Sequence, residues 1–219
     1  LAADMNSYRR HHWFLAVALA GLAGFVDAIG FLQTGGFFTA FMSGNSTRLS
    51  VGLLTEVSLA AVAAAMITIF VAGVTLGTII TRQVPDRARL PVAIGGVAVL
   101  LASAALLAML GKTTPAIGCT LLAMGMENTA FQREGQVSIG LTYLTGTLVK
   151  LGQALSRIHR AGHHWEWAPY LMLWLGLVTG AGLGAMAFLD WGLLALWPSA
   201  GFGLLLAAIA CLPRFAVTE

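Results

Sequence analysis

Long apolar runs constrain the fold of this chain more than any other feature of its sequence. A helix needs roughly 20 apolar residues to cross about 30 Å of hydrocarbon, and six windows meet or approach that length. The chain is 58% hydrophobic and only 10% charged, a balance that excludes an ordinary soluble domain. The lipid bilayer is therefore the expected solvent. The six windows are Trp13–Leu32, Val57–Ile80, Leu90–Leu110, Pro115–Phe131, Ala168–Leu189 and Gly192–Leu212.

Two further apolar segments, Phe37–Leu54 and Val137–Leu155, are interrupted by polar residues around Gly44 and Gly146. Each of them either dips into the membrane and returns or crosses it fully. Basic residues concentrate on the cytoplasmic side of membrane proteins. If both segments dip in and return, nine arginines fall on one side of the membrane, and only Lys112, with Arg48 in the broken segment, is left for the other. The pattern therefore favours six spans with both termini cytoplasmic, although an oblique crossing stays open. The arginines placed together are Arg9, Arg10, Arg82, Arg87, Arg89, Arg133, Arg157, Arg160 and Arg214.

The second half of the chain repeats the first at an offset of about one hundred residues. Three spans in each half is an odd number, so the two repeats enter the membrane from opposite sides. We expect an all-α membrane protein of six transmembrane helices, arranged as two inverted three-span repeats that each contain a Gly-broken re-entrant or discontinuous segment. The matches are Gly24–Asp27 with Gly125–Asn128, Phe41–Asn45 with Tyr143–Thr147, Arg48 with Lys150, Gly73 and Gly77 with Gly180 and Gly184, and Pro91 and Gly96 with Pro198 and Gly203.

The repeat also predicts how the chain is divided. We expect a single membrane domain with a cytoplasmic N-terminal segment over residues 1–12, a first repeat over 13–110, a second over 111–213 and a C-terminal tail over 214–219. Inverted repeats with broken segments are typical of transporters and channels, whose sites lie near the midplane at the repeat interface. Non-helical backbone at that depth must be buried in protein or lined by water. The alternative is that two packed helices merely kink at Gly44 and Gly146.

Asp27 lies well inside the first predicted span, where a lone carboxylate is costly unless it is paired, protonated or facing water. One interpretation makes it a proton or cation site coupled to transport. The other is structural: Asp27 forms an ion pair with Arg48, echoed by Glu127 with Lys150 in the second half. The two interpretations are compatible, because a buried pair that opens and closes is also a switch.

Arg48 and Lys150 follow the two breaks at equivalent positions, near the start of the helix expected after each. A helix N-terminus beside a cation favours an anion, which points to an anionic or carboxylate-bearing solute. Neutral side chains around the breaks supply further donors and acceptors, or simply satisfy backbone groups freed by the glycines. The candidate site comprises Asp27, Thr39, Ser43, Gly44, Asn45, Arg48, Asn128, Thr142, Thr145, Gly146, Thr147 and Lys150.

The glycine pairs Gly73–Gly77 and Gly180–Gly184 have the small-xxx-small spacing that lets two membrane helices approach closely. We interpret them as packing between the repeats rather than as a dimer interface. The sequence shows no Walker-type loop, HExxH, GxSxG elbow or defined metal-ligand spacing. It therefore predicts no enzyme, no cofactor and no metal, and the scattered basic residues predict no nucleic-acid partner.

The run Gly24-Phe-Val-Asp27-Ala, with Phe38 through Ser46, Gly125-Met-Glu-Asn128 and Thr142 through Leu148, resembles the YoaK-like family of bacterial multi-spanning membrane proteins. The resemblance extends from about Trp13 to Leu212 and implies a six-span inner-membrane protein of this size. It supplies no substrate. Glu127 stands where that family commonly has Gln, and this shifts the weight toward Asp27 and the two breaks.

The leading functional hypothesis is a secondary transporter or channel for a small polar or anionic solute, with Asp27 as the coupling or gating group. The rivals are a non-transporting membrane scaffold or accessory protein and a lipid- or isoprenoid-handling protein. Transport predicts that Asn45, Arg48, Thr147 and Lys150 converge on one hydrated cavity, whereas a scaffold predicts that they are satisfied separately. The sequence leaves open the solute, the coupling ion and whether the protein forms a homo-oligomer.

Overall fold

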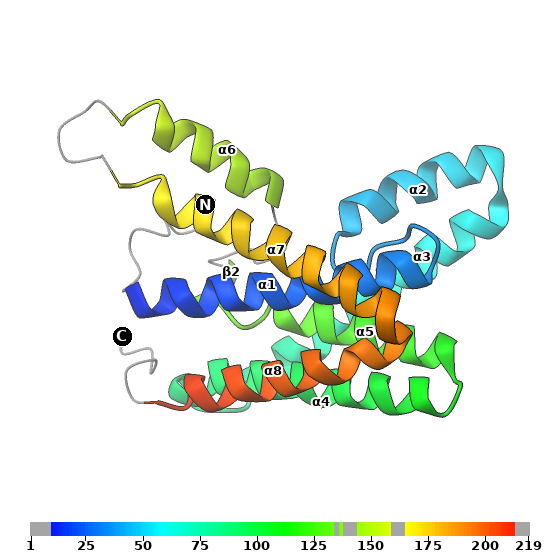
Figure 1. The fold of residues 1–219 in the computed structure, drawn as a ribbon. Helices are drawn as coiled ribbons and strands as arrows, with labels where there is room; N and C mark the ends of the chain where they lie inside the picture. The colour runs from blue at the N-terminus through cyan, green and yellow to red at the C-terminus, as the bar shows by residue number, and fades with distance from the viewer. Residues whose placement is uncertain (1–9, 134–135, 138–143, 159–164, 213–219) are drawn as a thin grey trace.

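The protein is a bundle of α-helices (Figure 1). The computed structural model describes residues 10–133, 136–137, 144–158 and 165–212. The small β-hairpin contributes only two residues from each strand. The elements are α1 (Arg10–Gln33), α2 (Met42–Thr55), α3 (Val57–Arg82), α4 (Asp86–Met109), α5 (Thr113–Glu127), β1 (Gln132–Arg133), β2 (Gln136–Val137), α6 (Leu144–Leu155), α7 (Ala168–Trp191), the 3₁₀ turn η2 (Gly192–Ala195) and α8 (Leu196–Ala210).

Four stretches of the described chain are long and apolar enough to cross a membrane: Trp13–Gln33, Val57–Arg82, Asp86–Met109 and Ala168–Ala210. The last one is 43 residues long and contains both α7 and α8, which meet at Gly192 with a φ of 57°. The predicted span Pro115–Phe131 is not among the four. Its helix, α5, has 15 residues and a length of about 22 Å at 1.5 Å per residue. A multi-pass helical membrane protein is thus confirmed, but the six-span count is not.

The helices of the first half pack mainly against helices of the second half (Figure 1). The most extensive contact joins α1 to α7, and α3 joins α5 in the matching way. Helix α4 packs against both α5 and α8, whereas α2 lies on α3 and α6 lies on α7. The two halves are therefore interlocked into one bundle.

Glycines allow the two main helix crossings to be this close. A Cβ atom on Gly24 of α1 would overlap the carbonyl oxygen of Leu177 in α7, and one on Gly125 of α5 would overlap the carbonyl oxygen of Phe70 in α3. The predicted glycine pairs take part in the same crossings, since Gly73 and Gly77 face α5 while Gly180 and Gly184 face α1. The prediction that these glycines pack helices of the two halves together is confirmed.

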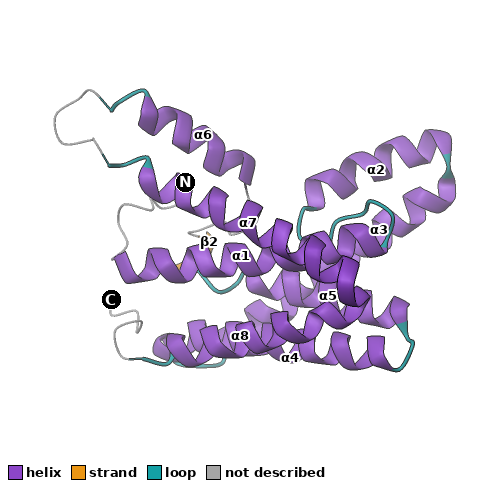
Figure 2. Cartoon of the chain, viewed as in Figure 1, coloured by secondary structure: helices purple, strands orange, loops and turns teal. Residues whose placement is uncertain are grey.

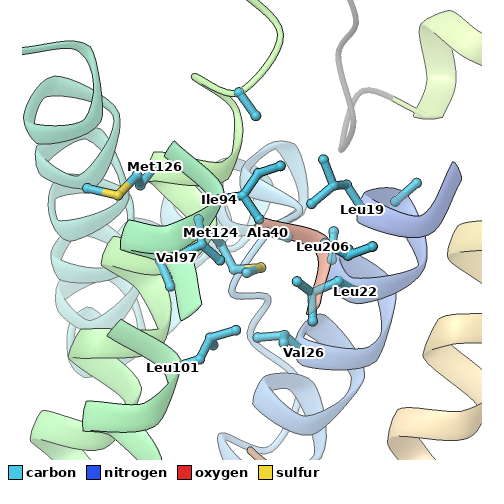
Figure 3. Packing of buried hydrophobic residues seen from close by; sticks show 14 of the residues in the cluster. Leu19, Leu22, Val26, Ala40, Ile94, Val97, Leu101, Met124, Met126 and Leu206 are labelled. Carbon is cyan, nitrogen blue, oxygen red and sulfur yellow. The ribbon is translucent and has the colours of Figure 1, made fainter. Parts of the chain in front are cut away.

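A large hydrophobic core lies where α1, α4, α5 and α8 meet (Figure 3). Leu19 and Leu22 of α1 are essentially unexposed, as are Ile94 of α4 and Met124 of α5. Large apolar side chains are also exposed along α3, including Val57, Val62, Val71 and Ile79. Such an outer surface suits contact with lipid, because lipid tails are as apolar as these side chains.

Candidate functional site

The link between α1 and α2, residues 34–41, contains the first real break in the chain (Figure 2). Gly35 and Gly36 both have positive φ, 68° and 112°, a conformation that glycine adopts without steric cost. The Thr34 hydroxyl donates to the Gly30 carbonyl at 2.7 Å and accepts from the Phe37 N–H at 3.1 Å. The prediction that the break is centred on Gly44 is wrong, because α2 already begins at Met42.

Asp27 fastens this link to α1. Its Oδ1 accepts hydrogen bonds from the backbone N–H groups of Thr39 and Ala40, both at 2.7 Å, and from the Thr39 hydroxyl at 3.3 Å. Gly30 leaves room for the Thr39 side chain, which a Cβ at that position would strike. Because an extended link has no helical partners for its N–H groups, the carboxylate of Asp27 supplies the acceptors that the link lacks.

Asn45 holds the same link from the side of α2. Its side-chain amide donates to the Phe38 carbonyl at 2.7 Å and its Oδ1 accepts from the Phe38 N–H at 3.0 Å. Gly44 does not mark a helix kink. A glycine is needed at this position because a Cβ atom would press on the rings of Phe38 and Phe41. The structure thus brings together Asp27, Thr39 and Asn45, three of the predicted site residues.

Arg48 does not pair with Asp27. Its guanidinium lies over the Phe37 ring, 4.9 Å from the centroid, and beside Gly36. Among the described residues no carboxylate lies within ion-pair distance of it. The predicted ion pair is wrong because two backbone N–H groups satisfy Asp27 at shorter range. Ser43, by contrast, is exposed and takes no part in holding the link.

The second half supplies the equivalent residues in a different arrangement. The Asn128 amide donates to the Met124 carbonyl of its own helix at 2.9 Å. In α6, Thr145 is exposed, Gly146 is half-buried and Thr147 is buried. The Lys150 ammonium lies over the Tyr170 ring, 5.9 Å from its centroid. Thr142 lies outside the described residues, so the prediction for it stays open.

Glu127, the last residue of α5, does not pair with Lys150. Its side chain is fully buried, and neither carboxyl oxygen has a hydrogen-bond partner among the described residues. The second predicted ion pair is therefore wrong as well. A buried polar group without a partner is rare and costly in proteins, so this carboxyl group calls for an explanation.

Three of the four residues expected to converge have separate surroundings. Asn45 is bonded to Phe38, Arg48 lies on Phe37 and Lys150 lies on Tyr170. Each of these contacts stays within one half of the chain. In Figure 1, α2 and α6 start near the middle of the bundle and run toward its opposite ends. The described contacts of these three residues therefore remain separate between the two halves.

Two features of the region were missed in the sequence. The Gly35–Gly36 pair after Thr34 is a turn signal that would have placed the break correctly. The other feature is an apolar cavity of about 420 Å³ between α1, α7 and α8, for which the sequence gives no local signal. The cavity is lined by Val17, Ala18, Gly21, Leu22, Phe25, Gly176, Thr179, Gly180, Leu183, Pro198, Ser199 and Phe202.

Comparison with known proteins agrees with this picture of a membrane protein. Residues 15–209 match the model of a family described as "Protein of unknown function (DUF1275)". The chain is also 36% identical, over 202 residues, to the UPF0700 transmembrane protein RA0705 of Rhizobium meliloti (strain 1021). That alignment covers 91% of this chain and 87% of the relative. No solved structure matches the chain.

Proposed function

We propose that this chain, which belongs to the DUF1275 family, is a membrane carrier for a small polar or anionic solute. The membership confirms the YoaK-like resemblance of the motifs around the two breaks, because YoaK-like proteins are the DUF1275 family. The proposed site is the link between α1 and α2 together with its counterpart before α6, near the bilayer midplane. We place the protein in the bacterial inner membrane with both termini cytoplasmic.

The observation that carries the proposal is that polar side chains hold a non-helical link by hydrogen bonds inside an otherwise apolar bundle. Asp27 and Asn45 hold residues 38–40 through four hydrogen bonds to backbone groups. Protein at membrane depth tolerates such a link only where it is buried or lines an aqueous path. If the hydrogen bonds from Thr39 and Ala40 to Asp27 break, the link is free to move. This carboxylate would then have a gating role.

The matched crossings of the bundle support two inverted repeats. Gly24 meets Leu177 as Gly125 meets Phe70, and those pairs differ by 101 and 107 positions, the same offsets that relate the two halves in sequence. In Figure 1, α1 and α5 run in opposite directions, as do α2 and α6. On this proposal α5 completes its crossing with the residues that follow Glu127, which gives three spans in each half.

An anionic solute is favoured by the charges around the first break. Among the described residues Arg48 has a ring but no carboxylate beside it, so its positive charge is available to a ligand. The exposed face of α2 carries four hydroxyl side chains, at Ser43, Ser46, Thr47 and Ser50. Hydroxyl groups suit water better than lipid, so on this proposal the N-terminal part of α2, before the exposed Val51, Leu53 and Leu54, provides an aqueous approach to the link.

Thermal unfolding of the detergent-purified protein tests the proposal. The probes are phosphate, sulfate, chloride, acetate and succinate, and the variants are Arg48→Ala and its matched control Lys112→Ala, which removes an exposed positive charge elsewhere. A ligand at 100 times its Kd stabilises by about 2.7 kcal/mol. We expect one anion to raise the unfolding temperature of the wild type and of Lys112→Ala but not of Arg48→Ala.

Uptake of that anion into proteoliposomes then separates a carrier from a scaffold. We expect uptake that Arg48→Ala abolishes. If no probe stabilises the protein and no probe is taken up, the proposed carrier is wrong for anions of this size, and the scaffold becomes the better hypothesis.

A second candidate function, the handling of a lipid or isoprenoid, is favoured by the cavity between α1, α7 and α8. Its lining is almost entirely apolar, and the hydroxyl groups of Thr179 and Ser199 donate to carbonyls of their own helices. It therefore offers an acyl or prenyl chain a surface without competing polar groups. Substitution of Ala18, another lining residue, by Leu would narrow the cavity, and mass spectrometry of co-purified lipids would show whether a specific lipid is lost.

A further inference from the structure

Glu127 stands apart from every other acidic side chain that the structure describes, because it alone is buried. It ends α5 on the face that carries Ala123 and Met124, and all three side chains have zero exposure. Figure 3 shows Met124 directed into the core between Val97 of α4 and Leu22 of α1. Glu127 follows Met124 by three residues and lies on this same core-facing side of the helix.

The polar groups closest to Glu127 along α5 are already engaged elsewhere. The hydroxyl of Thr120 donates to the Ala116 carbonyl at 2.9 Å and that of Thr129 to the Met126 carbonyl at 2.7 Å. The Asn128 amide donates to the Met124 carbonyl. Neither Oε1 nor Oε2 of Glu127 receives a hydrogen bond from any described residue.

The helices packed against α5 bring no compensating charge. Helix α3 has one ionisable residue, Arg82, and α4 has only Asp86, Arg87 and Arg89 in its first turn, where Asp86 and Arg89 pair at 2.6 Å. Helix α1 carries Asp27, which is bonded to Thr39 and Ala40. Its first three residues, Arg10, His11 and His12, are also ionisable. None of the described side chains among these forms an ion pair with Glu127.

An ionised carboxylate in such a place would cost many kcal/mol, so buried groups of this kind are normally neutralised instead. A metal cation would need several oxygen or nitrogen ligands, and no group of three His, Cys, Asp or Glu side chains that could hold one occurs in the described residues. A proton needs no ligand other than the carboxyl group itself. The surroundings therefore select the proton among the positive ligands.

We propose that Glu127 is a proton-binding site in the core of the bundle. In this conformation its side chain is the neutral acid, and the proton leaves when the helices around α5 move and admit water to the carboxyl group. The carboxyl O–H bond breaks, the proton passes to water and a carboxylate remains. That this proton is exchanged in step with a solute rests on the proposed carrier function, whereas the site itself does not.

Infrared spectroscopy of the protein in liposomes at neutral pH tests the site. A protonated carboxylic acid has a carbonyl stretch well separated from the bands of an ionised carboxylate. We expect this band in the wild type and in the matched control Glu56→Gln, whose side chain is exposed, and its loss in Glu127→Gln. Where Glu127→Gln does not fold, Glu127→Leu gives the same comparison. The proposal is overturned if the wild type lacks the band. It is also overturned if the band is unchanged in Glu127→Gln or, where that variant does not fold, in Glu127→Leu.

Proton movement in proteoliposomes tests the coupling separately. With a pH-sensitive dye inside, we expect the solute found in the uptake assay to drive acid movement in the wild type. In Glu127→Gln, downhill solute uptake should continue, but without the accompanying acid movement. Uptake without proton movement in the wild type overturns the coupling but leaves the carrier standing. Absence of uptake overturns the carrier, and the infrared result still decides the proton site.

Discussion

The acidic residues of α1 and α5, which belong to the first and second halves of the bundle, have different surroundings. In the first half Asp27 is half-buried and accepts three hydrogen bonds from the link that follows α1. In the second half the equivalent position is Asn128, whose amide donates to the Met124 carbonyl, and the adjacent Glu127 is fully buried with no hydrogen-bond partner among the described residues. The backbone crossings are nevertheless matched. Glycine therefore sets the shared architecture, and the polar residues beside it give each half its own chemistry.

The same contrast extends to the short helices. The exposed face of α2 carries Ser43, Ser46, Thr47 and Ser50, whereas the equivalent positions of α6 are Thr145, Leu148, Val149 and Gly152, also exposed. The α2 positions are all hydroxyl side chains and the α6 positions are mostly apolar, while α2 also exposes Val51, Leu53 and Leu54 near its C-terminal end. The two halves thus differ in the polarity of this one stretch of surface.

The matched crossings make the strongest prediction. Gly24→Val and Gly125→Val should each destabilise the protein by more than about 3 kcal/mol or prevent folding, because the added atoms overlap backbone of the facing helix. The matched controls are Gly182→Val and Gly118→Val, where a Cβ meets nothing within 4 Å. Thermal unfolding in detergent measures the difference. A large loss in only one half would break the symmetry of the comparison.

The next largest effect should separate Asp27 from Asn128. Asp27→Ala leaves the N–H groups of Thr39 and Ala40 without their acceptor, and we expect a loss of about 2 to 3 kcal/mol. Asn128→Ala removes a neutral bond within one helix and should cost about 1 kcal/mol. Denaturant unfolding of the two variants gives the comparison, with Asp27→Asn as an intermediate case. Equal losses would mean that the link is not held by Asp27.

Asn45→Ala tests whether the link is also held from α2. It removes both hydrogen bonds to Phe38 and should lower stability by about 1 to 2 kcal/mol. It should also make the backbone of residues 36–41 exchange its amide hydrogens faster, which hydrogen-exchange mass spectrometry can measure. The control is Ser46→Ala, one residue along the same helix on its exposed face. Unchanged exchange in Asn45→Ala would contradict the clamp.

The smallest effect concerns the two cations. Arg48 lies 4.9 Å from the centroid of the Phe37 ring, and Lys150 lies 5.9 Å from that of Tyr170. Cation–π contacts contribute about 0.5 to 1 kcal/mol where they are exposed and more where they are desolvated; since both cations here are partly exposed, Arg48→Ala should cost about 1 kcal/mol and Lys150→Ala less. Thermal unfolding without added ligand checks both. A greater loss in Arg48→Ala would indicate a structural role and weaken its assignment to a ligand.

Much of the fold follows from the apolar pattern. The pattern correctly places α1, α3 and α4, because each is an apolar stretch long enough to span the bilayer. It extends the fourth predicted span to Phe131, but α5 ends at Glu127. The helix stops there because the N–H groups of Thr129 and Ala130 turn to carbonyls only three residues back. A hydropathy pattern reflects only the apolar content of a segment. It does not show where hydrogen bonds to the residue four positions back give way to bonds to the residue three positions back.

The candidate site is less completely predictable. The sequence identifies three residues that do meet, because the repeat includes Asp27 and Asn45 and because Thr39 is a polar residue close to the first break. Their partners could not be predicted, because a sequence cannot show that backbone N–H groups, and not the guanidinium of Arg48, lie within hydrogen-bond distance of Asp27. The isolation of Glu127 depends on what α1 and α4 present to it, and that is a property of packing alone. Whether these residues bind a solute stays a prediction.

Gly192 has a consequence for how the protein is made. Helices α7 and α8 form a single apolar stretch of 43 residues, about twice what one crossing requires. The positive φ of Gly192 is the feature that turns the chain between them. Because only the exposed Asp190 and the short turn η2 separate the two apolar helices, we expect them to leave the insertion machinery as one hairpin. Insertion of these two helices would then depend on the turn that Gly192, a residue without a side chain, makes between them.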